Sequence, residues 1–225
     1  MSVAGGPYIV ENGLVLCLDV ANIKSYPGTG TTWTDISNNN HNGVLVNSPT
    51  CNGYGLSLNG TNQYAYISHS GALAFSNSNG FTVSVWHRNN DSNTTYNGII
   101  TNDYAGDNAW KIFRDNGQNN YQARSGSYTA AFPSYTVNMF HNYVYTFNGT
   151  STMILYFNGN FVSSNTGGVP ASQNYIAFGS YRYGDALSNT WLANQTLGPV
   201  ALYNRALTPS EVLQNFNAQK SRFNL

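Results

Sequence analysis

The eight residues FTVSVWHR, from Phe81 to Arg88, decide the fold class of this chain. Side chains of a β-strand alternate between its two faces. One face would carry Phe81, Val83, Val85 and His87, and the other would carry Thr82, Ser84, Trp86 and Arg88. Aromatic and β-branched residues are enriched in strands, so the stretch predicts a β-strand in a sheet.

The same period of two recurs in short runs along the whole chain, and HNYVYTFNG places Tyr143, Tyr145 and Phe147 on one face. Asn158-Gly159 lies between two apolar runs and predicts a tight hairpin, and Asn148-Gly149 looks similar. The candidate strands are 13–19, 43–46, 54–58, 64–67, 81–88, 97–101, 110–114, 121–124, 140–147, 153–157, 161–164, 175–179 and 197–203. Many short strands between turn signals indicate an all-β, two-sheet antiparallel β-sandwich or jelly roll.

One short C-terminal helix, at about 209–220, is predicted from its start signals. Thr208 is placed as the N-cap, Pro209 as the first helical residue, and Glu211 as the partner of Thr208 in a capping box. Leu207 and Val212 are placed for a hydrophobic staple. The expected apolar stripe consists of Val212, Leu213 and Phe216. We expect this helix to pack on the sandwich and to be structural.

Composition limits the partners of the chain. Charged residues make up 8% of its 225 residues, against roughly a quarter in ordinary domains, and the net charge is zero. We therefore expect no binding to nucleic acid or to membranes. The high tyrosine count of 17 suits a surface that contacts protein or glycan, although an unusually neutral surface is the alternative. With no linker or repeat, residues 1–225 are expected to form a single domain, with a short arm at about 1–10.

The N-terminus and the two cysteines add smaller expectations. The opening residues lack a basic region followed by a continuous apolar run, so we do not expect a Sec signal. Cys17 lies within the apolar run LVLCL and is expected to be a buried free thiol, and a bridge to Cys51 is the alternative.

The order of several segments resembles a laminin G-like, concanavalin A-like jelly roll. These segments are GLVLCLDVANIKSYPGTGTTWTDISNNNHNG, GLSLNGTNQYAYI, FTVSVWHR, LYFNGNFV, IAFGSY and LGPVALYNRALTPSEVLQNFNAQKSRF. They extend from about Ile9 to Phe223, and the opening and closing segments resemble modules of tailed-phage structural and fibre proteins and of bacterial surface proteins. The resemblance implies two antiparallel sheets and glycan or protein binding more often than catalysis. Asn59 and Gln63 stand where this family often has acidic residues, and Gly198-Pro199 stands in a last strand that often carries them, which puts a family-type calcium site in doubt.

The chain has few carboxylate side chains, nine in all, that could bind a metal ion or act in catalysis. The most suitable calcium ligands are Asp103 and Asp107 in TNDYAGDNAW, with Asp185 from another loop, although such residues are also common in turns. No obligate cofactor is expected. Glycoside hydrolysis requires two nearby carboxyl groups, and only Glu11 and Glu211 are glutamates. The four histidines have no metal-ligand spacing. We therefore expect no enzyme, and a glycoside hydrolase is the least favoured alternative.

Sugar recognition typically combines aromatic surfaces with a few polar groups. Loops 102–110 and 181–191 supply such residues, and the candidate ligand-binding set is Asp103, Tyr104, Asp107, Tyr181, Arg182, Tyr183 and Asp185. Trp110 and Trp191 flank these loops, and for both we favour a place in the core or at strand ends.

The tract DISNNNHNG, Asp35 to Gly43, looks chemically rich but is predicted to be a turn. Asn38 and Asn40 suit left-handed backbone, and Asp35 can accept hydrogen bonds from nearby backbone N–H groups.

The most favoured function is a non-enzymatic structural or adhesion module of a phage virion, in capsid decoration or a tail fibre. It would bind other virion proteins as an oligomer or on the particle, with host glycans as further ligands. A glycan-binding module of a bacterial surface protein is the alternative.

Overall fold

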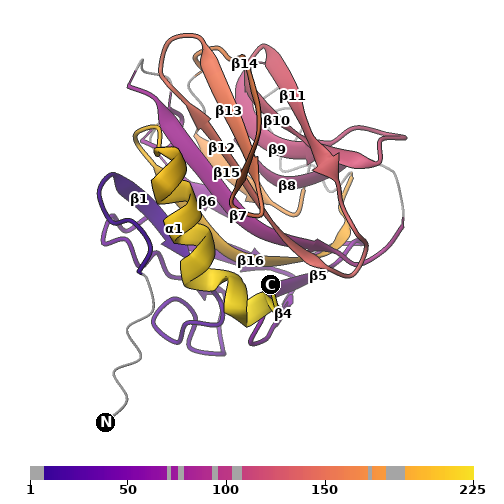
Figure 1. Cartoon of the computed structure of the whole chain (residues 1–225). Helices are drawn as coiled ribbons and strands as arrows, with labels where there is room; N and C mark the ends of the chain where they lie inside the picture. The colour runs from indigo at the N-terminus through magenta and orange to yellow at the C-terminus, as the bar shows by residue number, and fades with distance from the viewer. Residues whose placement is uncertain are drawn as a thin grey trace.

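The computed structural model describes residues 8–69, 72–75, 79–92, 96–102, 108–171, 174–180 and 191–225. Two antiparallel sheets of eight strands each face one another, and a single α-helix lies across the outer face of the first sheet (Figure 1). The strands of the first sheet are β1 (Leu14–Leu18), β4 (Thr50–Cys51), β5 (Leu56–Asn59), β7 (Phe81–Asn89), β12 (Phe140–Phe147), β13 (Thr152–Phe157), β14 (Asn160–Thr166) and β16 (Asn194–Tyr203). The strands of the second sheet are β2 (Thr32–Trp33), β3 (Gly43–Val46), β6 (Tyr64–Ser68), β8 (Asn97–Asn102), β9 (Ala109–Arg114), β10 (Asn120–Gly126), β11 (Tyr128–Ser134) and β15 (Tyr175–Phe178). The predicted sandwich is confirmed.

Strand β7 is central to the first sheet and shows why FTVSVWHR is informative. It pairs with β12 in continuous register, from Phe81 opposite Phe147 to Arg88 opposite Phe140. Its inward side chains Phe81, Val83 and Val85 belong to the main core between the sheets. That core also contains the inward face predicted for β12, namely Tyr143, Tyr145 and Phe147.

Strand β16 changes its partner halfway along. Asn194 to Leu197 pair with β5, and Val200 to Tyr203 pair with β1, while the register with β7 shifts between Leu197 and Val200. Gly198 and Pro199 occupy this irregularity. A Cβ on Gly198 would lie 2.8 Å from the Cβ of Trp86, so the glycine permits close packing against the outer face of β7.

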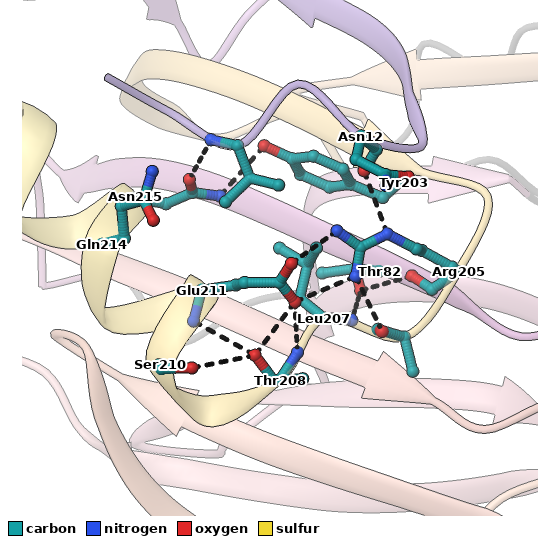
Figure 2. A network of polar contacts seen from close by, with 12 residues as sticks. Asn12, Thr82, Tyr203, Arg205, Leu207, Thr208, Ser210, Glu211, Gln214 and Asn215 are labelled. Atoms are coloured by element: carbon teal, nitrogen blue, oxygen red, sulfur yellow. Dashed lines mark hydrogen bonds and ion pairs between the residues drawn. The ribbon is translucent and has the colours of Figure 1, made fainter. Parts of the chain in front are cut away.

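The contact between α1 (Pro209–Gln219) and the outer face of the first sheet, called here the helix dock, begins with the predicted capping box (Figure 2). The Glu211 backbone N–H donates to Thr208 Oγ1, and the Glu211 carboxylate accepts from the Thr208 N–H at 2.8 Å. Glu211 also accepts from Arg205 at 2.6 Å. Leu207 and Val212, the predicted staple, lie in one buried cluster.

The buried face of the helix differs from the predicted apolar stripe at two positions, Leu213 and Asn215. Leu213 is 45% exposed, so its place in the apolar stripe is wrong, whereas Asn215 is buried. The Oδ1 of Asn215 accepts from the Val10 N–H at 2.8 Å, and its Nδ2 donates to the Tyr203 hydroxyl at 2.9 Å. The buried side chain of Asn215 therefore links α1 to the N-terminal segment and to β16 (Figure 2).

Aromatic stacking completes the helix dock. The ring of Trp86 lies between Phe216 of α1 and Phe223 of the 3₁₀ helix η1 (Lys220–Phe223), with centroid distances of 5.5 and 4.3 Å. The indole N–H of Trp86 donates to Gln219 at 2.7 Å. Both faces of β7 are therefore covered, the inner by the second sheet and the outer by the C-terminal helices.

The predicted turns follow backbone geometry. Asn158 and Gly159 both have positive φ, 50° and 76°. A two-residue hairpin such as the one between β13 and β14 requires this geometry. The Asn148-Gly149 turn is longer, and Asn148 Oδ1 accepts from the backbone N–H groups of residues 150–152.

The DISNNNHNG tract is also a turn, as predicted. Asn38 and Asn40 are left-handed, with φ of 69° and 61°. The Asp35 carboxylate accepts from the N–H groups of Cys17, Ser37 and His41. This aspartate holds the loop together and links it to β1.

Three strands were not predicted: β2, β4 and β11. The first two have two residues each, and β11 contains Pro133, which speaks against a strand in sequence patterns. The proline is tolerated because β11 is an edge strand of the second sheet. Cys17 and Cys51 are both free, and Cys17 is buried. Within the described residues, no helix is long and apolar enough to cross a membrane.

Candidate functional site

The end of the sandwich where β7 stops and β8 starts carries a small polar cavity, called here the mouth. Its volume is about 150 Å³. It is lined by Asn59, Gly60, Asp91, Arg114, Leu192, Ala193 and Asn194. These residues come from the ends of β5, β7, β9 and β16, so the two sheets together build the mouth.

Gly60 brings the β5–β6 turn close to β16. Its φ is +70°, and a Cβ there would lie 2.6 Å from the backbone nitrogen of Asn194. Asn59 forms the same turn by accepting three backbone N–H groups, from Thr61 to Gln63. An amide oxygen is sufficient for this role, so the turn does not require a carboxylate at position 59.

Asn90 fixes the position of Asn194 at the rim. The Asn90 backbone N–H donates to the Asn194 carbonyl at 3.0 Å, and the Asn90 Nδ2 donates to the Asn194 Oδ1 at 3.1 Å. Both bonds occupy acceptors of Asn194, and neither occupies its amide N–H groups. The rim therefore offers a positioned amide donor to a ligand.

Trp191 stands beside the mouth in an unusual conformation. Its φ is 66°. Such a value is rare for a bulky residue and is associated with functional sites. The indole is 37% exposed and lies 4.9 Å from the ring of Tyr96, centroid to centroid. Trp191 directly precedes Leu192 in the cavity wall, so an aromatic surface adjoins a polar cavity.

A cluster of buried polar side chains lies behind the mouth, between the sheets. Gln195 Nε2 donates to the Gly98 carbonyl, so its Oε1 faces His87 Nε2 at 2.7 Å. His87 therefore carries its proton on Nε2. The pKa of His87 is lowered to about 3, chiefly by burial; the hydrogen bond to Gln195 opposes this shift, and the nearby charge of Arg114 contributes to it. His87 is neutral at physiological pH.

Arg114 connects this cluster to the mouth. It lines the cavity but is only 1% exposed. Its guanidinium donates to the Tyr135 hydroxyl and lies 5.5 Å from the centre of the Tyr121 ring. The side-chain oxygens of Asn89 and Asn97 are buried nearby without a hydrogen-bond partner in the described structure, and such atoms are rare in folded proteins.

The size and chemistry of the mouth limit what it can bind. Its volume of about 150 Å³ is small for a ligand site, since ligand pockets typically start at roughly 300 Å³. The mouth therefore suits one polar portion of a larger ligand that also covers the rim. Asp91 is the one carboxylate among the described lining residues, whereas glycoside hydrolysis uses a pair.

The sequence-predicted site residues lie outside the described residues: Asp103, Tyr104, Asp107, Tyr181, Arg182, Tyr183 and Asp185. The described flanks of the two loops differ in position. Asn102 pairs with Trp110 at the end of β8 that is remote from Asn97 and Arg114. Ser180 instead bridges to Leu192, in the wall of the mouth.

Calcium binding at Asp103 and Asp107 stays a prediction. Among the described residues, no group of three histidine, cysteine, aspartate or glutamate side chains is arranged to hold a metal ion. Glu211 serves the capping box and the ion pair with Arg205.

The two tryptophans that flank the predicted loops behave differently. Trp110 is fully buried in the core, whereas Trp191 is 37% exposed and lies at a strand end, next to the bridge that Leu192 forms, so each tryptophan occupies one of the two predicted kinds of position. The sequence interpretation misses Arg114 as a site residue. In WKIFR it shares the period-two face of Trp110 and Ile112, both of which lie in the core. The charged Arg114 at the end of this otherwise apolar face was the feature of the sequence that could have indicated a site.

Several much larger solved structures contain this fold. Trypanosoma rangeli sialidase in complex with sialic acid matches with a TM-score of 0.69 and 17% identity, over 93% of this chain and 33% of that chain. The receptor-binding domain of botulinum neurotoxin C/D mosaic serotype matches with a TM-score of 0.69 and 14% identity, over 93% of this chain and 52% of that one. The binding domain of botulinum neurotoxin serotype D gives a TM-score of 0.68 and 14% identity, over 93% and 53%. The chain thus spans a third to about half of the structures it matches, and at these identities the likeness concerns the fold.

No curated protein matches the sequence. A family model does match, over residues 59–213, and its description is the concanavalin A-like lectin/glucanases superfamily, in its laminin G-like form. The match begins at Asn59, the last residue of β5, includes β7, β9 and β16 of the mouth, and ends within α1. The chain belongs to the concanavalin A-like lectin/glucanases superfamily.

Proposed function

We propose that this chain is a non-catalytic adhesion module that binds carbohydrate at the mouth. The observation that carries the proposal is Trp191, an exposed indole held in a left-handed conformation against Tyr96 and next to a polar cavity. An aromatic surface packs on the apolar face of a sugar ring, while amide and charged groups orient its hydroxyls. Asn194 and Asp91 supply such groups at the cavity.

The absence of catalysis is part of the proposal and rests on the chemistry of the described groups. His87 is buried and neutral, so it is poorly placed to accept and release protons near pH 7. Asp91 lacks a second carboxylate among the described lining residues. The sialidase with a similar fold was solved in complex with sialic acid, and a glycan ligand for the present chain is consistent with membership of a lectin-containing superfamily.

We further propose that the module works on a phage virion, as a capsid decoration or tail-fibre component. The support is the resemblance of the opening and closing segments to modules of such proteins, together with the low charge and the high tyrosine content. Weak single-site binding would then be strengthened by many copies on one particle. A bacterial surface protein with the same glycan-binding site is the second candidate, supported by the same resemblance.

A glycan array with labelled protein tests the carbohydrate proposal. We expect binding to a limited set of glycans, and Trp191→Ala should weaken it at least about ten-fold, since a stacked aromatic residue is removed from the site. Tyr128→Ala is the matched control. Tyr128 is 48% exposed and is the first residue of β11, at the opposite end of the sandwich. Equal binding by wild type and Trp191→Ala, or no binding by the wild type, contradicts the proposal.

Two further measurements test catalysis and placement. Release of reducing sugar from a polysaccharide panel would show that the chain is an enzyme. A strictly monomeric protein by light scattering, together with no labelling of purified virions by an antibody against it, would refute the virion role. Specific glycan binding that survives this second result would favour the bacterial surface protein.

A further inference from the structure

A second and larger groove opens on the outer face of the first sheet, beside the C-terminal end of the chain. Its volume is about 400 Å³, within the usual range of ligand-binding pockets. The residues that matter for its chemistry are Tyr54, Arg88, Asn138, Phe140, Phe223 and Asn224. They come from the β4–β5 turn, from the end of β7, from the start of β12 and its preceding turn, and from the end of η1.

One wall of this groove is aromatic. The ring of Tyr54 is stacked with that of Phe140 at 6.4 Å, and Phe140 contacts Phe223 at 4.5 Å. Phe140 and Phe223 are each 8% exposed, whereas Tyr54 is 49% exposed. The buried pair therefore supports Tyr54, whose ring is available to a ligand.

Arg88 places a cation over the same wall. Its guanidinium carbon lies 5.2 Å from the centre of the Phe140 ring. Its hydrogen bonds go to Asn90 Oδ1 at 2.8 Å and to Thr196 Oγ1 at 3.2 Å, both of which are neutral. Arg205 and Arg222 form ion pairs with Glu211 and Asp19, whereas Arg88 has no carboxylate partner among the described residues. These two neutral bonds hold the guanidinium in position without pairing it to a carboxylate.

Asn138 and Asn224 line the groove and have left-handed backbone conformations, with φ of 64° and 59°. Their backbone N–H groups are bonded, to Asn89 and to η1 respectively. Their side-chain amides make no hydrogen bond to the described protein, and neither does the Tyr54 hydroxyl. Three neutral polar groups and the Arg88 cation thus lie around an aromatic wall, and Met139 and Leu225, the last residue of the sequence, complete the lining.

We propose that this groove binds a sugar that carries a carboxylate, with Arg88 pairing the carboxylate and Tyr54 stacking against the sugar ring. Asn138 and Asn224 would then bond the ring hydroxyls. Charge selects an anion, the aromatic wall selects a ligand with a flat apolar face, and the two amides select one with several hydroxyls. An acidic peptide would satisfy the first two requirements and use the amides less fully.

The groove is distinct from the mouth but adjoins it. Asn90 contacts Arg88 on the groove side and Asn194 at the rim of the mouth. Lining residues are not shared between the two cavities. The proposal therefore stands independently of glycan binding at the mouth.

A titration of the ¹⁵N-labelled full chain, followed by NMR, tests it. The probes are D-glucuronic acid and N-acetylneuraminic acid, with D-glucose as the neutral probe. Both acids should shift the Arg88 Nε–H signal and the side-chain amide signals of Asn138 and Asn224, and D-glucose should shift them far less. Arg88→Gln should weaken binding of the acids about ten-fold or more, as expected for loss of a charged hydrogen bond. Raising the salt concentration should also weaken binding.

Controls separate this result from misfolding and from the mouth. Lys24→Gln removes another exposed cation and should leave binding unchanged. Tyr54→Ala alters an exposed side chain, so it should keep the fold and still weaken binding. Trp191→Ala should leave the groove signals unaffected, even if the mouth binds nothing. Equal shifts with D-glucose, or an unchanged affinity in Arg88→Gln, overturn the proposal. Tighter binding of acetyl-Glu-Phe-amide than of either acidic sugar would show that the groove binds an acidic peptide, and this would overturn the sugar proposal.

Discussion

The helix dock and the mouth are built on the same two strands, β7 and β16, but with opposite chemistry. At the helix dock, Trp86 stacks between two phenylalanines, and Asn215 satisfies both its acceptor and its donor. At the mouth, Trp191 is exposed on a left-handed backbone, and buried amide oxygens lack partners in the described structure. The helix dock is organised for stability, whereas the mouth retains strain and unpaired polar groups, which is typical of binding sites.

Trp86→Ala should produce the largest effect on stability. It removes two stacking contacts and the bond to Gln219. Truncation of a buried aromatic residue costs about 3–5 kcal/mol of unfolding free energy, which urea unfolding followed by circular dichroism would measure. Phe161→Ala is the matched control, since this ring is 62% exposed on the edge strand β14. The control should change the free energy by less than about 0.5 kcal/mol. A loss below about 1 kcal/mol for Trp86→Ala would show that the helix contributes little.

Acid should weaken the interior behind the mouth before it weakens the helix dock. Burial lowers the pKa of His87 to about 3, from about 6.5 in an unfolded chain. Between these pKa values the unfolded state binds more protons than the folded state. The contribution of neutral His87 to the unfolding free energy is therefore fully present above about pH 7 and is lost as the pH falls below about 6.5. At pH 5, His87 alone should cost about 2 kcal/mol of unfolding free energy. Burial lowers the pKa of His69 and of His141 as well, and they act in the same direction.

The helix dock responds at lower pH. Arg205 and the Thr208 cap hold the pKa of Glu211 at about 2, so this carboxylate stays ionised at pH 5. Urea unfolding from pH 7 to pH 5 tests the difference. His87→Gln should flatten the pH dependence. A free energy that is equal at pH 7 and pH 5 in the wild type would contradict the assignment of His87 as a buried neutral residue.

The same contrast explains what could be predicted from the sequence. The helix dock depends on local signals, so Thr208, Pro209 and Glu211 indicated its start, and period-two patterns indicated most strands. Even there, the inward turn of Asn215 could not be predicted, because its partners Val10 and Tyr203 are held in place by the tertiary fold. The mouth depends on four strand ends that come together only in the folded sheet order. The secondary-structure propensity of each segment does not indicate which strand ends lie side by side in the fold. From the sequence alone, Trp191 therefore resembled an ordinary strand-end residue.

Trp191→Gly tests whether the mouth differs from the helix dock, and it should have the smallest effect on the free energy of unfolding. A left-handed backbone costs a residue with a Cβ about 1–2 kcal/mol, and glycine avoids that cost. Glycine loses more chain entropy on folding, and the contact with Tyr96 disappears. The net expectation is a gain of about 0.5 kcal/mol or no change, measured by urea unfolding, together with loss of glycan binding. Trp191→Ala, which keeps the unfavourable backbone geometry, should be less stable than Trp191→Gly. If both variants lose stability equally, the indole is a packing residue, and the mouth is no different in kind from the helix dock.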